Sequence, residues 1–584
     1  MEITRLFDVP YYQLEHFSSD KSLSIKLGNE WKHYSSQDVI DEINKLSAGL
    51  IKRGIKAGDK IALISLNRPE WIFADIAIQQ VGAINVPLYP NITVKDYNYV
   101  IEQSGSVMAF VGSKDLLEKL TDATKDIAGF NGIYSFDKFE NAVHWTELQA
   151  DYSSEADEIE KRKQAIKPTD LATIIYTSGT TGFPKGVMLT HHNILSNSEA
   201  VAERFSVVSA GFRALSFLPL CHIFERTASY THMRLGVQVY FTSIEEIGEA
   251  MKEIHPHYFA TVPRLLEKVY DKIVKKGYEL TGVKKTLFFW ALGLGEKFDP
   301  NENKGWWYNK QLKLANKLIF SKWREALGNE ILFIISGAAA LQPRLARVFW
   351  AAQIPILEAY GLTETSPGIS FSKIEPGGYR LACVGPLLKD VQVRIAEDGE
   401  IQAAGPGIMQ GYYKLPEQTA EVLKDGWFST GDIGVMEDGF LKITDRKKEM
   451  FKTSGGKYIA PQQMENKFKE SMYIEQIMVV GEGQKHPSAL IIPDYESVKE
   501  WCKIHNSQCN SIDEMLKSEK VKEKFDSEME HYNKEFAHYE QIKKYTLLSQ
   551  PWTIEGDELT PTLKLKRKNI MEKYAAEVEA FYTE

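Results

Sequence analysis

The sequence predicts an α/β protein. We expect a large N-terminal domain of doubly covered mixed or parallel sheets, a small β-barrel-like unit, and a smaller, mobile α+β C-terminal domain. Short apolar segments alternate with segments of helical spacing through the first 115 residues, and two Asp-Gly turns separate strand-like segments after residue 380. After about residue 446 the chain becomes rich in lysine, and its 584 residues suit roughly three to four domain-sized units.

The composition excludes several classes of protein. Hydrophobic residues make up 43% and charged residues 26%, so the chain is neither a disordered tail, nor a collagen, nor a small disulfide scaffold. Its net charge of -9 argues against a broad nucleic-acid-binding surface, and we expect no nucleic-acid partner. No segment reaches the roughly 18 apolar residues of a membrane span, and we find no secretory signal. The four cysteines form no CxxC pair, which favours reduced thiols in the cytoplasm.

The first block of the chain alternates between strand-like and helix-like segments. Residues 60–65, 83–88 and 107–111 are short apolar segments of strand length. Residues 70–80 and 94–103 have helical spacing between them. This alternation predicts βαβ units and a mostly parallel sheet.

The middle of the chain continues this pattern after a charged segment, residues 153–167, which separates it from the first block. Residues 171–176 (LATIIY) and 331–335 are predicted to be buried strands. The long segment between them includes residues 270–327, which are rich in aromatic residues and lysine and look helical. We expect its four tryptophans to be core residues, because tryptophan is usually buried; the alternative is a helix surface that rests on a membrane. These tryptophans are Trp290, Trp306, Trp307 and Trp323.

The last third of the chain has a different character. The Asp-Gly pairs at 398–399 and 438–439 each lie between strand-like segments, which predicts two antiparallel hairpins. Further on, apolar residues at helical spacing predict an amphipathic helix that packs on a core; they are Val521, Phe525, Tyr532, Phe536 and Tyr539. We place the N-terminal domain at residues 1–444, with a β-rich subdomain at about 380–444, and the C-terminal domain at 449–584.

The strongest chemical signal is the segment YTSGTTGFPKG, residues 176–186. A buried strand leads into it, and it combines hydroxyl groups, glycines and one lysine, as a polyphosphate-binding loop requires. The hydroxyl groups belong to Thr177, Ser178, Thr180 and Thr181, the glycines are Gly179 and Gly182, and the cation is Lys185. The segment is not a Walker A loop, because glycine follows the lysine. A flexible Ser/Gly linker is the alternative, but linkers rarely follow a buried strand.

This loop resembles the phosphate loop of the adenylate-forming enzymes, which include acyl-CoA synthetases, luciferases and adenylation domains. Other motifs of that superfamily occur in the same order: YGLTET at residues 360–365, STGD at 429–432, and DRKK at 445–448. Longer segments are similar to long-chain fatty acyl-CoA synthetases. These are LPLCHIFE at 218–225, the signature-like residues 425–461, and LTPTLKLKR at 559–567.

The resemblance implies a reaction in two half-steps that uses ATP, Mg²⁺ and coenzyme A. A fatty carboxylate attacks the α-phosphate of ATP and expels pyrophosphate, and the thiol of coenzyme A then displaces AMP from the acyl-adenylate. Glu364 matches the ligand of Mg²⁺, a cation that prefers oxygen. Thr363 matches the contact to the α-phosphate, and residues 177–185 would hold the β- and γ-phosphates. Lys564 matches the lysine that bridges the carboxylate and the α-phosphate.

The same resemblance assigns the nucleoside and coenzyme A contacts. Asp432 would accept hydrogen bonds from the ribose hydroxyls, and Arg446 would contact the ribose or a phosphate. Segments SGAA (336–339) and EAYG (358–361) would line the adenine, with Tyr360 stacked on it. The adenine-lining residues are Gly337, Ala338, Glu358, Ala359, Tyr360 and Gly361. Gly455 and Gly456 would let the backbone approach the pantetheine thiol, and Lys448, in the hinge at 445–448, would be the pivot of a domain rotation.

Two residues that the resemblance singles out, Lys564 and His222, have explicit alternatives. The alternative to Lys564 is Lys566, one turn away. Leu563 stands where many members of the superfamily have glycine, and long-chain enzymes often lack that glycine. His222 would gate the acyl pocket or fill the pyrophosphate-side cleft and move between half-reactions; the alternative is a core histidine. Cys221 beside it is interpreted as a packing residue.

The predicted function also has alternatives. The acyl group could pass to an acyl-carrier protein, the acid could be another hydrophobic carboxylate, or a luciferase-like oxygenase could share the motifs for ATP. A binding or uptake protein on the same fold is disfavoured by the intact loop and by Glu364, Asp432 and Lys564. The sequence leaves a homodimer and a peripheral association with the inner face of a membrane as open alternatives for a cytoplasmic protein.

Overall fold

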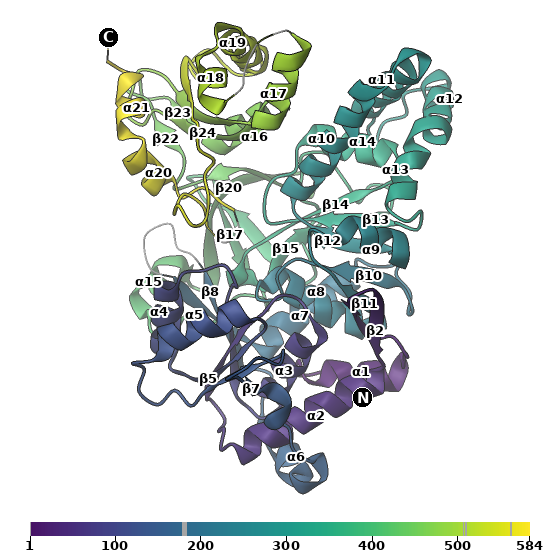
Figure 1. The fold of residues 1–584 in the computed structure, drawn as a ribbon, viewed down its shortest axis with the longest axis vertical. Helices are drawn as coiled ribbons and strands as arrows, with labels where there is room; N and C mark the ends of the chain where they lie inside the picture. The colour runs from purple at the N-terminus through teal and green to yellow at the C-terminus, as the bar shows by residue number, and fades with distance from the viewer. Residues whose placement is uncertain (1, 178–183, 506, 508–510, 561–562, 584) are drawn as a thin grey trace. The chain divides into compact units, whose positions relative to one another are not determined.

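The computed structural model describes residues 2–177, 184–505, 507, 511–560 and 563–583 (Figure 1). The chain divides into two compact units. The first comprises residues 1–394, 402–430 and 436–441, and the second comprises residues 395–401, 431–435 and 442–584. The domain boundaries predicted above remain predictions. None of the described helices is long and apolar enough to cross a membrane.

The first unit contains an eight-stranded sheet with the order β18-β9-β8-β4-β3-β5-β6-β7. Its strands are β3 (Lys60–Ile64), β4 (Ile84–Pro87), β5 (Ser106–Val111), β6 (Ile133–Ser135), β7 (Val143–His144), β8 (Leu171–Thr177), β9 (Lys185–Thr190) and β18 (Gly411–Tyr412). Strand β3 pairs in parallel with β4 and β5, and α3 (Pro69–Gln80) and α4 (Val94–Ser104) connect them, which confirms the predicted βαβ units.

The charged segment 153–167 does not separate two layers of the molecule. It contains helix α6 (Ala156–Ala165), and Ile159 of this helix is buried. The strands before and after it belong to one sheet, because β8 pairs in parallel with β4. The predicted break in the chain is therefore a crossover within one sheet.

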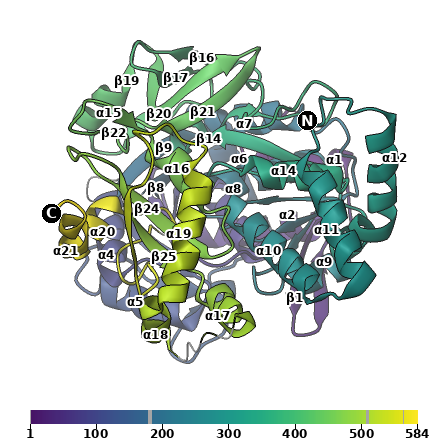
Figure 2. The ribbon, with the colours of Figure 1, turned by 90° about the horizontal axis from the view of Figure 1, so that it is seen from above.

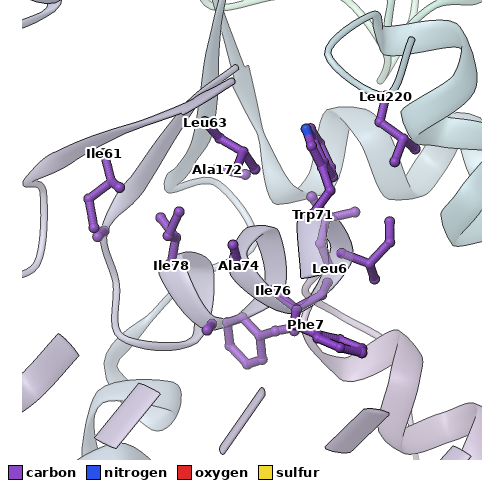
Figure 3. Close-up of a cluster of buried hydrophobic side chains, with 14 of the residues drawn as sticks. Leu6, Phe7, Ile61, Leu63, Trp71, Ala74, Ile76, Ile78, Ala172 and Leu220 are labelled. Atoms are coloured by element: carbon purple, nitrogen blue, oxygen red, sulfur yellow. The ribbon is translucent and has the colours of Figure 1, made fainter. Parts of the chain in front are cut away.

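Helix α3 lies at the centre of the core of this unit. Residues 71–80 are all buried, so the helix has no solvent-facing side. Figure 3 shows side chains of this helix, Trp71, Ala74, Ile76 and Ile78, in one cluster with side chains of other elements: Leu6, Phe7, Ile61, Leu63, Ala172 and Leu220. Burial on this scale stabilises the fold by about 1.5–3 kcal/mol for each large apolar side chain, and it fixes the strand that precedes the predicted phosphate loop.

A second eight-stranded sheet has the order β15-β14-β13-β12-β10-β11-β1-β2. Its strands are β1 (Leu23–Leu27), β2 (Glu30–Tyr34), β10 (Arg213–Ser216), β11 (Gln238–Phe241), β12 (Tyr258–Thr261), β13 (Phe333–Ser336), β14 (Ile356–Gly361) and β15 (Gly368–Phe371). The sequence predicted β13 but not the N-terminal strands that complete the sheet. The other helices of the unit are α1 (Asp8–His16), α2 (Ser36–Lys52), α5 (Lys114–Thr124), α7 (His191–Ala202), α8 (Ile223–Arg234), α9 (Ile247–Ile254), α14 (Pro343–Ala351) and α15 (Pro416–Val422).

Residues 263–326 are mostly helical, which confirms the helical character predicted for residues 270–327. They form α10 (Pro263–Glu279), α11 (Gly282–Glu296), α12 (Trp306–Ala315), a π-helical segment η3 (Asn316–Phe320) and α13 (Ser321–Ala326). The prediction that the four tryptophans are core residues is wrong for two of them. Trp323 is buried and Trp290 is half-buried, but Trp306 and Trp307 are 73% and 62% exposed.

The two predicted hairpins are present in a five-stranded sheet. Its strands are β16 (Gln392–Ile395), β17 (Glu400–Ala404), β19 (Leu423–Lys424), β20 (Trp427–Glu437) and β21 (Phe440–Arg446), with the order β16-β17-β20-β19 and β21 beside β20. Asp438 and Gly439 have φ of 50° and 85°, the left-handed backbone that a tight hairpin turn requires.

The C-terminal part of the second unit has a three-stranded sheet of β24 (Ile474–Val480), β25 (Ser488–Pro493) and β26 (Lys544–Leu547), and a small hairpin of β22 (Phe451–Lys452) and β23 (Tyr458–Ile459). Its helices are α16 (Pro461–Phe468), α17 (Tyr495–Ile504), α18 (Ile512–Lys517), α19 (Glu519–Asn533), α20 (Arg567–Lys573) and α21 (Ala575–Ala580). The predicted amphipathic helix is α19, but Phe536 and Tyr539 follow its end, and Tyr539 is exposed.

Candidate functional site

The stems of the predicted phosphate loop form an antiparallel pair. Strand β8 ends at Thr177 and β9 begins at Lys185, and these two residues are register partners. The hydroxyl of Thr177 donates to the carbonyl of Lys185 at 3.5 Å. The loop residues Ser178, Gly179, Thr180, Thr181 and Gly182 lie outside the described part of the chain. The strand pair therefore places a hydroxyl and an ammonium group at the two ends of that loop.

Lys185 and Glu364 both contact a third residue, Tyr412. The ammonium of Lys185 lies 5.0 Å from the centre of the Tyr412 ring, a cation–π distance. The Tyr412 hydroxyl donates to Glu364 Oε1 at 3.0 Å. Burial, together with the Glu364 carboxylate, raises the pKa of the Tyr412 phenol, so this hydroxyl stays a donor at neutral pH. A cation, a phenol and a carboxylate thus form one cluster.

Backbone pairing fixes the position of Tyr412. Strand β18, which carries it, pairs antiparallel with β9, and Tyr412 is the register partner of Val187. The amide of Met409 donates to the carbonyl of Glu364 at 2.9 Å. One short segment therefore contacts both the stem of the loop and the residue predicted to bind Mg²⁺. The sequence analysis missed Tyr412, because a single tyrosine in the segment GYY carries no motif that marks it.

Thr363 and Glu364 lie in a tight turn after β14. Thr363 begins the 3-10 helix η4 (Thr363–Thr365) and is buried, whereas Glu364 is half-buried. Thr365 closes the turn, since its hydroxyl accepts a hydrogen bond from the amide of Leu362 at 3.0 Å. Asn197 of α7 bonds both backbone groups of Gly368 just beyond it, at 2.8 and 3.1 Å. The turn is thus held from both ends, which orients the Glu364 carboxylate.

The two segments predicted to line the adenine lie side by side. They follow the neighbouring parallel strands β13 and β14, in which Ser336 pairs with Glu358. A Cβ added to Gly337 would lie 3.3 Å from the Phe224 ring and 3.5 Å from the carbonyl of Ala359, so the backbone is closely approached there. Crevices at the carboxyl ends of parallel strands are the usual place for a ligand in α/β proteins.

The remaining residues of these segments have distinct environments. Ala338 has a left-handed backbone with φ of 68°, and a Cβ at Gly361 would lie 1.8 Å from the carbonyl of Pro367, so only glycine fits there. Tyr360 is half-buried. The Glu358 carboxylate is buried and accepts a hydrogen bond from the Tyr379 hydroxyl at 3.1 Å. Burial raises the pKa of Glu358 to about 8.

Polar groups without a partner also occur at this edge of the sheet. Thr261 and Ser336, the last residues of β12 and β13, are register partners. Both hydroxyl oxygens are buried and have no hydrogen-bond partner among the described residues. Buried hydroxyls are usually paired, so this edge carries unused hydrogen-bonding capacity.

His222 is the N-cap residue of α8. Its Nδ1 accepts a hydrogen bond from the amide of Phe224 at 3.2 Å, and its ring lies 6.5 Å from that of Tyr89. The side chain is half-buried. In the same helix, Arg226 forms a fully buried ion pair with Asp75 and donates to the Thr173 hydroxyl of β8 at 2.7 Å. This network connects the helix of His222 to the strand that precedes the phosphate loop.

In the second unit, Asp432 and Arg446 are paired. Arg446 Nε lies 3.4 Å from Asp432 Oδ1, and the Asp432 side chain is 8% exposed. The neighbouring Lys447 bonds Asp398 at 2.6 Å and Glu400 at 2.8 Å, whereas Lys448 is exposed. The structure therefore brings together the two residues predicted to contact the ribose.

In this unit, the segment predicted to approach coenzyme A and the segment of the predicted reactive lysine are exposed turns. Gly455 and Gly456 lie in the turn between β22 and β23, and Gly456 has φ of 77°. Lys564 is exposed, and its amide donates to the Thr560 hydroxyl at 3.0 Å. Lys566, the alternative to Lys564, forms an ion pair with Asp557. Leu563 has φ of 60°, and this left-handed conformation explains why glycine suits the position.

Comparison with known proteins identifies the family of this chain. The family model described as AMP-binding enzyme matches residues 13–413, and the model described as AMP-binding enzyme C-terminal domain matches residues 449–584. The chain belongs to the AMP-binding enzyme family.

Relatives are similar to this chain over most of its length, and a solved structure shares its fold. The protein named long-chain-fatty-acid–CoA ligase FadD15 of Mycobacterium bovis is 33% identical over 94% of this chain and 92% of its own length. Long-chain-fatty-acid–CoA ligase 5 of Mus musculus is 32% identical over 95% of this chain and 85% of its own. The adenylation domain of a carboxylate reductase from Mycobacterium chelonae has a TM-score of 0.76 at 19% identity, over 99% of this chain and 91% of that one. This likeness confirms the predicted fold class.

Proposed function

We propose that this chain is an ATP-dependent long-chain fatty acid–CoA ligase. It activates a fatty acid to acyl-AMP with release of pyrophosphate, and then transfers the acyl group to coenzyme A with release of AMP. The cluster of Lys185, Tyr412 and Glu364 beside the stems of the loop carries this proposal. Relatives that are about one-third identical over nearly the whole chain bear the name of this activity.

The residues present suit a nucleoside triphosphate with Mg²⁺. No group of three or more His, Cys, Asp or Glu side chains that could enclose a metal ion occurs in the part of the chain that the structure describes. Mg²⁺ bound with a nucleotide takes most of its ligands from phosphate and water, so the single carboxylate of Glu364 fits it. Bound there, the ion would neutralise phosphate charge. The unpartnered hydroxyls of Thr261 and Ser336 offer further polar contacts at the same sheet edge.

In the first half-reaction, a carboxylate oxygen of the acid bonds to the α-phosphorus of ATP, and the bond to pyrophosphate breaks. An anion must approach a polyanion, so fixed positive charge lowers the barrier. We assign Lys185 to the β- and γ-phosphates, Thr363 to the α-phosphate and Lys564 to the reacting oxygens. The Tyr412 hydroxyl holds the Glu364 carboxylate in one orientation.

In the second half-reaction, the sulfur of coenzyme A bonds to the acyl carbon, and AMP leaves with the electrons of the acyl–phosphate bond. The two half-reactions need different groups beside the same adenylate. We assign the turn at Gly455 and Gly456 to the approach of the thiol, because its backbone is open to a ligand. We assign the exchange of groups to a rotation about Lys448, which is exposed and follows the anchored Lys447.

The products of one incubation test this function. The purified protein is mixed with ATP, Mg²⁺, coenzyme A and, separately, acetate, octanoate or palmitate, and acyl-CoA, AMP and pyrophosphate are measured. The proposal predicts palmitoyl-CoA and AMP in equal amounts. Acyl-AMP that accumulates without a thioester would instead indicate transfer to a carrier protein. Activity on acetate alone would refute the long-chain assignment.

We further propose that the enzyme works in the cytoplasm at the inner face of a membrane, where a long-chain acid resides. We assign this location to a peripheral contact. The exposed tryptophans of α12 identify a surface for it.

A further inference from the structure

The helical segment from α12 through α13 has two unlike faces. One face packs against α11: the Tyr308 hydroxyl donates to the carbonyl of Leu294 at 2.8 Å, and Ala315 and Phe320 are buried. The other face is exposed along the whole of α12 and η3. Figure 2 shows α12 on the outer side of α11, at the periphery of the first unit.

The exposed face carries large apolar side chains. Trp306 and Trp307 are 73% and 62% exposed, and Leu314 and Leu318 are 48% and 45% exposed. The spacing from Trp307 to Leu314 and Leu318 is that of residues on one side of a helix. Val283, in the adjoining first turn of α11, is 75% exposed. Contiguous apolar side chains are rarely exposed to water on the surface of a protein, so a group of them indicates a binding surface.

The same face is strongly basic. Residues 304–324 contain five lysines and one arginine but no aspartate or glutamate, although the whole chain has a net charge of -9. Two of these lysines, Lys304 and Lys322, pair with the flanking Glu302 and Glu325. Lys310, Lys313 and Lys317 are exposed, and none of them forms an ion pair with a described residue. The ammonium of Lys310 lies 5.0 Å from the centre of the Trp306 ring. Positive charge is therefore interleaved with the apolar side chains.

We propose that this surface, which we call the α12 face (Trp306, Trp307, Lys310, Lys313, Leu314, Lys317 and Leu318), binds the surface of an anionic lipid bilayer. The tryptophans and leucines enter the headgroup region, and the lysines contact lipid phosphates. Tryptophan and lysine are the residues that anchor proteins at this boundary. The helix lies in the plane of the membrane and does not cross it. The purpose of this contact, delivery of the fatty acid, rests on the proposed function, but its physical basis does not.

Charge complementarity favours lipid over a protein partner. Lysine is depleted in the cores of protein interfaces, because its ammonium must lose water there. At a bilayer surface, the ammonium stays hydrated beside phosphate while the aliphatic part of the side chain covers apolar surface. Each lysine near an anionic membrane contributes to attraction that falls with salt. A face with alternating lysine and apolar side chains thus fits lipid better than a folded protein.

Cosedimentation with vesicles tests the proposal. Vesicles of equal parts phosphatidylcholine and phosphatidylglycerol are compared with vesicles of phosphatidylcholine alone, at low and high salt. The protein should bind the anionic vesicles, and high salt should weaken binding. The affinity of the variant W306A/W307A and that of the variant K310E/K313E/K317E for anionic vesicles should each be lower by about tenfold or more. A matched charge reversal at the exposed lysines near α5, K114E/K119E/K125E, should leave more binding than the reversal on α12.

Other outcomes overturn the proposal in recognisable ways. Equal binding by the wild type and both α12 variants would show that the face does not contact lipid. Equal loss in the α5 variant would show a response to net charge alone. If the α12 variants instead change the sedimentation coefficient of the free protein, the face is an interface between copies of the chain.

Activity separates this proposal from the proposed function. The α12 variants should keep the wild-type rate with palmitate in the absence of vesicles, because the face is not part of the site. Vesicle binding without any ligase activity would leave the α12 face standing and remove the proposed function. Ligase activity without vesicle binding would support the proposed function and overturn the proposal that the α12 face binds lipid.

Discussion

The candidate site residues of the first unit and those of the second unit are held in different ways. Lys185, Tyr412 and Glu364 are half-buried or buried, and strand pairing and turn hydrogen bonds fix them. Lys564 and the turn at Gly455 and Gly456 are exposed and lie in loops. Groups that bind a polyanion must be preorganised, whereas groups that serve only one half-reaction must be able to leave. The contrast therefore matches a division between a fixed nucleotide site and exchangeable reactive groups.

The largest expected effect is at the exposed lysine. Lys564→Ala should lower the rate of pyrophosphate formation by about a hundredfold to a thousandfold, because one charge at the reacting oxygens is lost. Affinity for ATP should change little, and transfer of the acyl group from supplied acyl-AMP to coenzyme A should continue. Stopped assays of each half-reaction measure the rate of pyrophosphate formation and the rate of acyl transfer separately. Lys566→Ala is the matched control, since its partner is Asp557; an equal loss there would contradict the choice of Lys564.

The second effect concerns the carboxylate predicted to bind Mg²⁺. Glu364→Gln keeps the shape of the side chain and the hydrogen bond from Tyr412 but removes the charge. We expect about a hundredfold loss in kcat/KM, and a higher Mg²⁺ concentration at half-maximal rate. A magnesium titration of the initial rate measures this. An unchanged magnesium dependence would remove Glu364 from the metal site.

A smaller effect is expected at the residue that sequence reasoning missed. Tyr412→Phe removes one hydrogen bond to a carboxylate but keeps the ring that contacts Lys185. We expect about a tenfold loss in kcat, consistent with a charge-assisted hydrogen bond. Tyr412→Leu should cost more, because it also removes the ring. If both variants have wild-type kinetics and the same magnesium dependence, Tyr412 does not position Glu364.

The smallest effect is on stability alone. Burial raises the pKa of Glu358 to about 8, so the folded protein holds a proton that the unfolded chain releases near pH 4.5. The free energy of unfolding should therefore fall as pH rises from about 4.5 to about 8, by at most about 1.4 kcal/mol per pH unit from this group. Glu358→Gln should flatten that slope in urea denaturation curves, because the amide can still accept the hydrogen bond from Tyr379. A slope equal to that of the wild type would contradict the buried neutral form.

The sequence predicted the elements whose signal is local. Strands β3, β4, β5, β8 and β13 are short apolar segments, and burial on both faces of a parallel sheet produces such segments directly. The N-terminal strands β1 and β2 were not predicted, because both contain partly exposed residues and lack that signal; β2 is the edge strand, and β1 lies between β2 and β11. Elements defined by long-range pairing carry little information in their own residues.

The same limit applies to the site. Motifs identified Glu364 and Lys185, but only the pairing of β18 with β9 brings Tyr412 between them. Periodicity could not show that Trp306 and Trp307 face outward, since tryptophan is buried in most proteins. The absence of acidic residues from 304–324 was visible in the sequence and would have favoured a surface position.

The exchange of labelled pyrophosphate into ATP, without coenzyme A, tests the central claim most directly. It reports formation of acyl-AMP by the fixed nucleotide site and does not depend on thioester formation. We predict exchange that requires palmitate and Mg²⁺ and that falls steeply in Glu364→Gln. Exchange with no acid present, or no exchange with acetate, octanoate or palmitate while the protein remains folded, would contradict the assignment of this site to adenylation of a fatty acid.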